Sequence, residues 1–241
     1  MLPHFSGDYL INLQTPYPLS VAAESTGGRS FYMVTQSTDI DAGSNTVPAF
    51  TTILADPPWD VQQRGPLGAE RHYDLMSLEA IKHMPVGDLA APDSHCWLWV
   101  TNATLRAGYD VMEAWGFTPR SPLTWIKPRI GLGQYLRNST EHLILGTRGN
   151  APVKFRAQPT WMFAPLQRHS EKPQEQYAVI ERISDGPYLE LFARRRPPSD
   201  KSWSIWGNEV DSDIVIPGYP VPSDERHPRS SDREASDAAS S

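Results

Sequence analysis

The segment Ile53–Asp60, ILADPPWD, combines residue types that could hold and orient a nucleobase. The apolar residues before Asp56 predict a strand, so this carboxylate would stand where the strand leaves the sheet and could accept a hydrogen bond from an exocyclic amine. The Pro57-Pro58 pair fixes the backbone, which allows a carbonyl to accept a second hydrogen bond. Trp59 offers a flat face on which a base can stack.

The rigid segment Asp56–Trp59, called the ledge below, suits methylation of an amine on a base. The lone pair of that amine is delocalised into the ring, so the nitrogen is a poor nucleophile until two acceptors draw it out of conjugation. Preorganised electrostatics would then supply most of the catalysis. Taken alone, the segment fits equally well a rigid turn in which Asp56 caps the residues that follow.

The elements that must position this ledge alternate between strands and helices. We expect strands over Thr51–Ala55, Cys96–Val100, Leu123–Ile126, Leu143–Gly146 and Tyr188–Phe192. We expect helices over Ser77–Met84, over Leu105–Trp115, and from a Ser170 cap through Pro173 to about Ile183. This alternation predicts an α/β sheet with helices on both faces. Ligands of such sheets bind beyond the carboxyl ends of the strands, where Asp56–Trp59 and Ala193–Arg196 fall.

The composition along the chain predicts three parts. Residues 1–48 are expected to form an irregular N-terminal extension with one strand around residues 30–35, and residues 49–210 the main domain. Residues 211–241 are acidic and of low complexity, which predicts a disordered tail.

Charge and cysteine content narrow the class of protein. The formal net charge is −6, but residues 51–210 carry 17 acids and 18 Lys and Arg, so the composition allows nucleic-acid binding without favouring it. Cys96 is the only cysteine, no apolar run is long enough to span a bilayer, and no signal peptide is evident, so we expect a cytoplasmic protein. Cys96 lies in an apolar strand, which favours a core residue over a nucleophile, and the scattered histidines predict no metal site.

Several blocks occur in a characteristic order: LADPPW, AERHYDLMSLEAI, CWLWVTN, AWGF, LTWIKP, EHLILGTRG, HSEKP, LELFARR and WGNEV. In this order they resemble the MT-A70-like adenine methyltransferases, which use S-adenosylmethionine. The resemblance runs from Ile53 to Val210. It implies a Rossmann-like class I methyltransferase fold, circularly permuted so that the catalytic block precedes the cofactor block.

The resemblance also implies roles for individual residues. In the catalytic block, Asp56 and a carbonyl of Pro57 or Pro58 would hold the target amine, and Trp59 and Tyr73 would lie beside the target base. Tyr73 could instead be a core residue. The residues expected at the cofactor are Asp56, Ser170, Lys172, Phe192, Arg194, Asn208 and Glu209.

Within the cofactor set, Lys172 would bind the cofactor carboxylate, for which a compact ammonium at a helix start is suited. Phe192 would back the cofactor and Arg194 would contact its ribose region, while Asn208 and Glu209 would bond the ribose or adenine. Lys172 could instead be a solvated lysine, and Arg194–Arg196 could be a solvated or phosphate-facing patch. Asn208 and Glu209 could form a turn at the start of a strand.

The expected reaction is site-specific methylation of the adenine N6 amine, in DNA rather than RNA, since the single domain resembles the prokaryotic and phage DNA enzymes. An RNA enzyme and an inactive nucleic-acid-binding or scaffold member remain alternatives, as do homo- and heterodimers. Residues 128–139, with Arg129 and Arg137, predict a mobile gate beside the site whose basic residues could contact phosphate.

Overall fold

The computed structural model describes residues 19–26, 29–36, 49–60, 75–133, 135–168, 171–216 and 218–219, so Tyr73 and Ser170 lie outside the described residues. Its main sheet has seven strands in the order β7-β5-β6-β4-β3-β8-β9. In chain order these are β3 (Phe50–Ala55), β4 (Ala90–Val100), β5 (Thr118–Ile126), β6 (Thr140–Arg148), β7 (Trp161–Phe163), β8 (Tyr188–Leu191) and β9 (Trp203–Trp206).

Within this sheet, β6 runs antiparallel to both of its neighbours, and the other pairings are parallel. The carboxyl ends of β3, β4, β5, β7, β8 and β9 therefore lie together at one edge, the carboxyl edge, where β6 begins. The five strands expected from the sequence are present. β3 to β6 extend beyond the predicted ranges, and β8 ends at Leu191, one residue before the predicted end.

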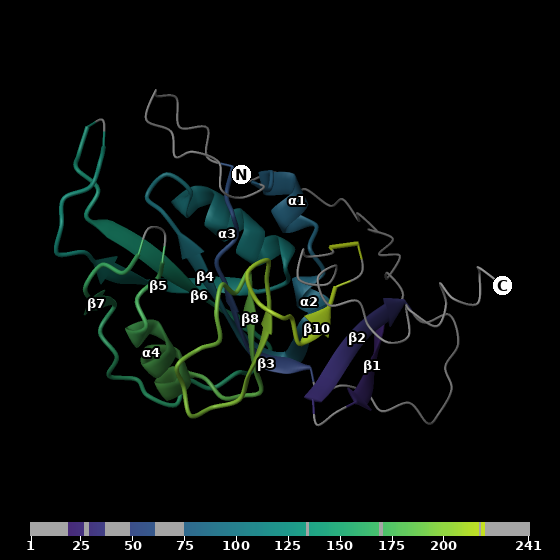
Figure 1. Cartoon of the computed structure of the whole chain (residues 1–241). Helices are drawn as coiled ribbons and strands as arrows, with labels where there is room; N and C mark the ends of the chain where they lie inside the picture. The colour runs from purple at the N-terminus through teal and green to yellow at the C-terminus, as the bar shows by residue number, and fades with distance from the viewer. Residues whose placement is uncertain are drawn as a thin grey trace, which may run out of the picture.

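Helices cover both faces of the sheet, as predicted (Figure 1). One face carries α1 (Leu78–Lys82), α2 (Val86–Leu89) and α3 (Leu105–Ala114), and α4 (Glu175–Ile183) packs on the other. Ser77 caps α1 by accepting a 3.1 Å hydrogen bond from the Ala80 N–H.

The predicted start of α4 is wrong. The helix begins at Glu175, and Pro173 belongs to the turn before it. The residue before a proline is disfavoured in the helical region, so Lys172 stays outside the helix.

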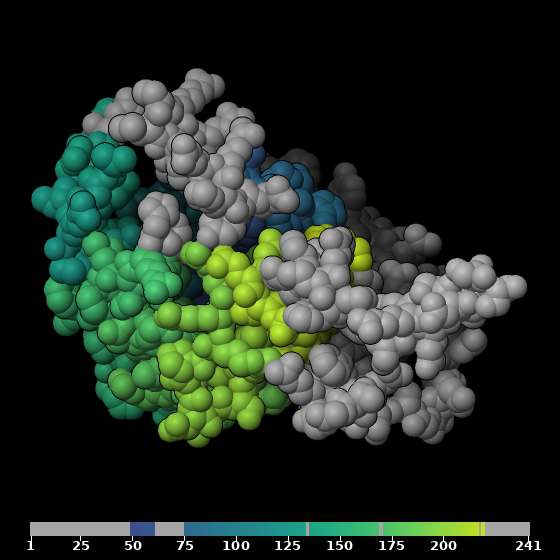
Figure 2. Space-filling view, viewed as in Figure 1, coloured from purple at the N-terminus to yellow at the C-terminus, as the bar shows by residue number. Residues whose placement is uncertain are grey.

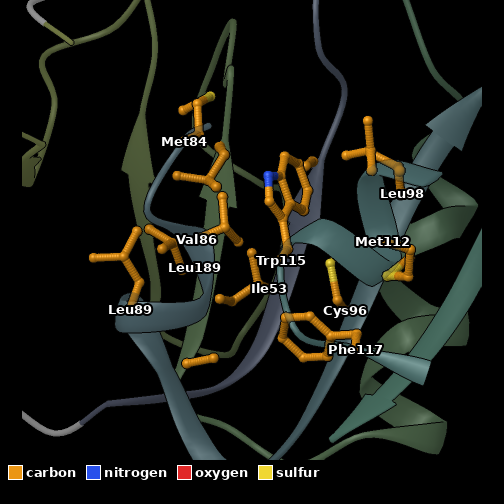
Figure 3. Close-up of a cluster of buried hydrophobic side chains, with 14 of the residues drawn as sticks. Ile53, Met84, Val86, Leu89, Cys96, Leu98, Met112, Trp115, Phe117 and Leu189 are labelled. Carbon is orange, nitrogen blue, oxygen red and sulfur yellow. The ribbon is translucent and has the colours of Figure 1, made fainter. Parts of the chain in front are cut away.

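The core has two parts because strand side chains alternate between faces. Ile53, Cys96 and Leu189 pack against Met112 and Trp115 on the α3 face, as Figure 3 shows. This confirms Cys96 as a core residue.

Leu54, Trp97 and Trp99 pack on the opposite, α4 face, against Tyr177 and Ile180. Continuing the alternation past Leu54 places Asp56 on the α4 face at the carboxyl edge.

A second sheet has the order β1-β2-β10, formed by β1 (Leu19–Thr26), β2 (Arg29–Gln36) and β10 (Ile214–Val215). The strand expected around residues 30–35 is therefore one arm of a hairpin. The predicted start of the disordered tail at residue 211 is wrong, because Ile214 and Ile216 are buried in the core. Apart from residues 218 and 219, the tail beyond residue 216 lies outside the described residues.

Candidate active site

Asp56 is held by an ion pair at the carboxyl edge. Its Oδ2 lies 2.8 Å from Nζ of Lys172, which donates to it from the segment leading into α4. The side chains are 30% and 16% exposed, so the pair is shielded by protein while the carboxylate remains accessible. The structure thus pairs Asp56, expected at both the target amine and the cofactor, with Lys172, expected at the cofactor carboxylate.

The ammonium of Lys172 has further partners. Oε2 of Glu141 lies 3.7 Å away, and the other oxygen of Glu141 accepts a 2.5 Å hydrogen bond from Lys127. The Trp99 ring centroid is 5.6 Å from the same ammonium. Sequence reasoning missed Glu141, whose signal was a charged residue just before the apolar run 143–145.

Burial and pairing act in opposite directions on these groups. Burial raises the pKa of Asp56 and outweighs the lowering effect of Lys172, so the pKa lies above the ordinary range of an aspartate. Burial lowers the pKa of Lys172, but Asp56 and Glu141 outweigh it, so the net shift is upward. Lys172 is therefore a permanent cation that limits how far the Asp56 pKa rises.

The two prolines form a tight turn whose carbonyls are already engaged. The Trp59 N–H donates to the Pro57 carbonyl at 2.9 Å, and the Met76 N–H donates to the Pro58 carbonyl at 2.9 Å. A carbonyl oxygen has two lone pairs, so either could still accept from an amine. The indole N–H of Trp59 donates to the Trp99 carbonyl at 3.1 Å, and the ring packs against the core, which fixes the ledge.

The other described residues expected at the cofactor follow β8 and β9. Phe192 takes a positive φ of 63°, a strained backbone for a residue with a side chain, and its ring meets Trp206 edge-on at 5.4 Å. Nε of Arg194 donates to Glu209 at 2.7 Å, with the exposed Asn208 beside it. The structure therefore brings Arg194 and Glu209 together from separate strands.

Arg196, in contrast, takes a structural position. Both of its terminal nitrogens donate to the carboxylate of Asp213, at 2.6 and 3.0 Å. This pair fastens the turn after β8 to the chain that leads into β10, and so Arg196 is not assigned to the cofactor.

A polar group beside Lys172 supports binding of a small polar ligand here. Nε2 of Gln174 donates to the Lys172 carbonyl, and Oε1 is buried with no hydrogen-bond partner among the described residues. With Lys172, Arg194 and Glu209 this gives donors and acceptors for a carboxylate, an ammonium and vicinal hydroxyls. S-adenosylmethionine carries all three, so the residues fit it.

Gly207 allows the loops after β8 and β9 to approach each other. A Cβ at this position would lie 2.0 Å from the carbonyl oxygen of Ala193. We therefore expect Gly207→Ala to lower the free energy of unfolding by about 1–3 kcal/mol and to weaken cofactor binding, because the backbone beside Arg194 must move. Denaturant unfolding and calorimetric titration would measure both.

Gly116→Ala is the matched control for that variant. Gly116 has a φ of 83° but nothing within 4 Å of the added Cβ, so the change strains the backbone without touching the site. We expect a loss of about 1 kcal/mol with cofactor affinity unchanged. Wild-type cofactor affinity in Gly207→Ala would contradict the role of this close approach.

A second partly buried acid, Glu190, lies on the α4 face and was not identified from the sequence. Tyr177 donates to it at 3.0 Å, and burial raises the pKa of Glu190 to about 8 despite that hydrogen bond. Because the pKa of Glu190 is raised from its ordinary value of 4.5, the unfolded state loses this proton at a lower pH than the folded state. The contribution of Glu190 to the unfolding free energy is therefore fully present below about pH 4.5 and falls as pH rises toward 8.

We therefore expect Glu190→Gln to flatten this loss, raising the unfolding free energy at pH 8–9 by up to a few kcal/mol relative to wild type. Urea unfolding at pH 5, 7 and 9 would measure it. Glu113→Gln, on the exposed side of α3, is the control. Parallel stability curves for wild type and Glu190→Gln would show that Glu190 is not the titrating group.

Comparison with known proteins identifies the family of this chain. The model of the MT-A70 family matches residues 50–209, which include both the Asp56 ledge and the Arg194–Glu209 pair. The chain belongs to the MT-A70 family. The mixed α/β sheet of this family member is consistent with a Rossmann-like methyltransferase fold.

Three curated relatives illustrate the match. The chain is 31% identical over 176 residues to an N(6)-adenosine-methyltransferase MT-A70-like protein of Arabidopsis thaliana, covering 69% of this chain and 24% of that protein. It is 30% identical over 173 residues to the human N(6)-adenosine-methyltransferase catalytic subunit METTL3, covering 67% and 28%. It is also 30% identical over 183 residues to the human N(6)-adenine-specific methyltransferase METTL4, covering 67% and 37%. The matched part of the chain thus covers 24% to 37% of the length of these relatives.

None of the helices in the described part of the chain has both the length and the apolar character needed to span a membrane. The same part of the chain contains no cluster of three or more His, Cys, Asp or Glu side chains arranged to hold a metal ion.

Proposed function

We propose that this chain transfers a methyl group from S-adenosylmethionine to the N6 amine of adenine in nucleic acid. The observation that carries the proposal is the Asp56 carboxylate, held accessible by Lys172 at the end of β3. The names of the relatives support adenine N6 as the position. We also propose that the fold is circularly permuted, since the catalytic residues after β3 precede in the chain the cofactor residues after β8 and β9.

Asp56 would accept one N–H of the target amine, and a carbonyl of Pro57 or Pro58 would accept the other through its unused lone pair. This holds the nitrogen out of conjugation with its lone pair directed at the incoming carbon. Bound S-adenosylmethionine supplies an electrophilic methyl group. Lys172 would hold the carboxylate of that ligand, and its charge keeps Asp56 ionised as an acceptor. The sulfur–methyl bond would break as the nitrogen–carbon bond forms, which leaves the cofactor as a neutral thioether. The amine proton would then pass to water.

We infer DNA as the first substrate to test, as expected from the resemblance to compact prokaryotic and phage enzymes. RNA is the second candidate, because most of the relatives carry the name adenosine methyltransferase. Both substrates present the same amine to the same ledge.

The deciding experiment incubates the chain with methyl-labelled S-adenosylmethionine and unmodified DNA or RNA of one sequence set, followed by digestion to nucleosides and mass spectrometry. N6-methyldeoxyadenosine would support DNA, and N6-methyladenosine would support RNA. Label in cytosine, or bound cofactor without transfer to either polymer, would overturn the proposal. Asp56→Asn is the negative control.

A further inference from the structure

Basic residues are concentrated in one part of the chain. Residues 114–170 contain eight Lys and Arg and a single acid, Glu141, in a chain whose formal net charge is −6. This segment builds β5, β6 and β7, which together form one end of the seven-stranded sheet. Figure 2 shows its teal and green residues gathered on the left side of the molecule. Positive charge is therefore localised at the β7 end of the sheet.

The basic residues divide between the two edges of the sheet. Away from the site, Arg120 donates to Thr147, Arg148 to the Gly87 carbonyl, and Lys154 pairs with Asp185. At the carboxyl edge, the loop between β5 and β6 exposes Arg129 and Arg137, and neither has an ion-pair partner among the described residues. Arg129 and Arg137 are thus exposed cations at the same edge as Asp56.

The β5–β6 loop (residues 127–139) is a narrow hairpin. The Gly131 N–H donates to the Asn138 carbonyl at 2.7 Å, and a Cβ on Gly133 would lie 1.9 Å from the Leu136 carbonyl oxygen. In Figure 1 it projects from the domain at the upper left. Near its tip Tyr135 is 92% exposed. An aromatic ring and two arginines therefore project together from a defined backbone.

Two more aromatic rings are exposed on β7, the edge strand. Trp161 is 53% exposed and Phe163 62%, whereas Met162 between them is buried in the core. Phe163 pairs in register with Ile126, which is 38% exposed. Phe163 and Ile126 end their strands, so they lie at the carboxyl edge. Large apolar side chains this exposed on one side of a strand indicate a binding surface.

We propose that the surface formed by Arg129, Tyr135, Arg137, Trp161 and Phe163, the β7 surface, binds single-stranded nucleic acid flanking the target adenine. The inference rests on the proposed function. Its aromatic rings would stack on bases, and its arginines would contact phosphates, which is how sequence-tolerant single-strand sites are built. Only unpaired bases expose faces for stacking, so a duplex is disfavoured.

The spacing of the sheet places this contact a few nucleotides from the reacting base. β7 is four strands from β3, or about 19 Å at about 4.8 Å per step. The five residues of the surface include two arginines and no acid, which fits a polyanionic ligand.

The test is fluorescence anisotropy of a labelled single-stranded oligonucleotide, without cofactor, at several salt concentrations. We expect Trp161→Ala and Phe163→Ala each to weaken binding about 5- to 150-fold, the equivalent of about 1–3 kcal/mol per stacked base. Arg129→Ala and Arg137→Ala should each reduce the slope of log affinity against log salt by about 0.7.

Phe155→Ala is the matched control, an exposed aromatic in the same basic segment beside Lys154, which bonds the Ile183 carbonyl at the opposite edge. It should bind like wild type. Circular dichroism would establish that every variant is folded.

The proposal would be overturned if folded Trp161→Ala and Phe163→Ala bound the oligonucleotide as tightly as wild type. A wild-type dimer that these variants dissociate with oligonucleotide affinity unchanged would also overturn it, since the surface would then be a protein interface. Measuring Asp56→Asn in the same anisotropy assay separates oligonucleotide binding, on which this inference depends, from methyl transfer, on which the proposed function depends. Binding that depends on Trp161 without any methyl transfer by wild type would overturn the function alone.

Discussion

The Asp56→Asn variant is expected to lose methyl transfer by about 100- to 1000-fold while retaining most cofactor binding. Asparagine keeps the shape of the side chain and can still accept from Lys172, but it removes the negative charge on which the developing positive charge of the amine depends. Loss of one preorganised polar group in a catalytic site has an effect of this size. Single-turnover kinetics with labelled cofactor and calorimetric titration would measure the two effects.

The pH dependence of this reaction has a defined direction. Burial raises the pKa of Asp56. On acidification, the fall in wild-type kcat should therefore begin at a higher pH than it would for an aspartate with an ordinary pKa. The acceptor is lost when the carboxyl gains its proton. Asp56→Asn has no such group, so its residual rate should lack that acid limb. Full turnover in Asp56→Asn would refute the catalytic assignment.

Replacing Lys172 by methionine is expected to lower both stability and cofactor affinity. Methionine keeps much of the chain length but leaves Asp56 and Glu141 close together without the cation between them. Removing one partner of a buried pair lowers stability by about 3–5 kcal/mol. The lower end, about 3 kcal/mol, applies here because the Asp56 side chain is 30% exposed.

Two measurements distinguish this effect from a general loss of fold. Urea unfolding would give the stability change, and the acid limb of kcat should move to still higher pH, since Lys172 no longer opposes the burial of Asp56. Lys82→Met, at an exposed pair with Glu79, is the matched control and should change stability by no more than about 0.5 kcal/mol. Equal stabilities of Lys172→Met and wild type would refute the bridging role of the ammonium.

Much of the fold could be predicted from local sequence patterns. Apolar runs identified the central strands, Ser77 identified the start of α1, and the spacing of Val111, Met112 and Trp115 identified α3. These signals extend over a few residues and depend little on the rest of the chain. The blocks around Asp56, Arg194 and Glu209 likewise identified positions that the structure places after neighbouring strands.

The contacts within the site could not be predicted in the same way. Asp56 and Lys172 are 116 residues apart in sequence, and Glu141 reaches them only because β6 runs against its neighbours and so starts at the carboxyl edge. The motif also gave no sign that the Pro57 and Pro58 carbonyls already accept backbone hydrogen bonds. Each of these depends on strand order and direction, which residue spacing does not encode.

The strand β10 has a consequence for shortening this chain. The family match ends at residue 209, yet Ile214 and Ile216 complete the core, and Asp213 bonds both Arg196 and the Ile205 N–H. Each buried isoleucine contributes about 1.5–3 kcal/mol, so a protein truncated after Val210 would lose a large share of a typical stability margin. The folded unit is therefore longer than the segment matched by the family model, and truncations designed on that boundary alone would yield unstable protein.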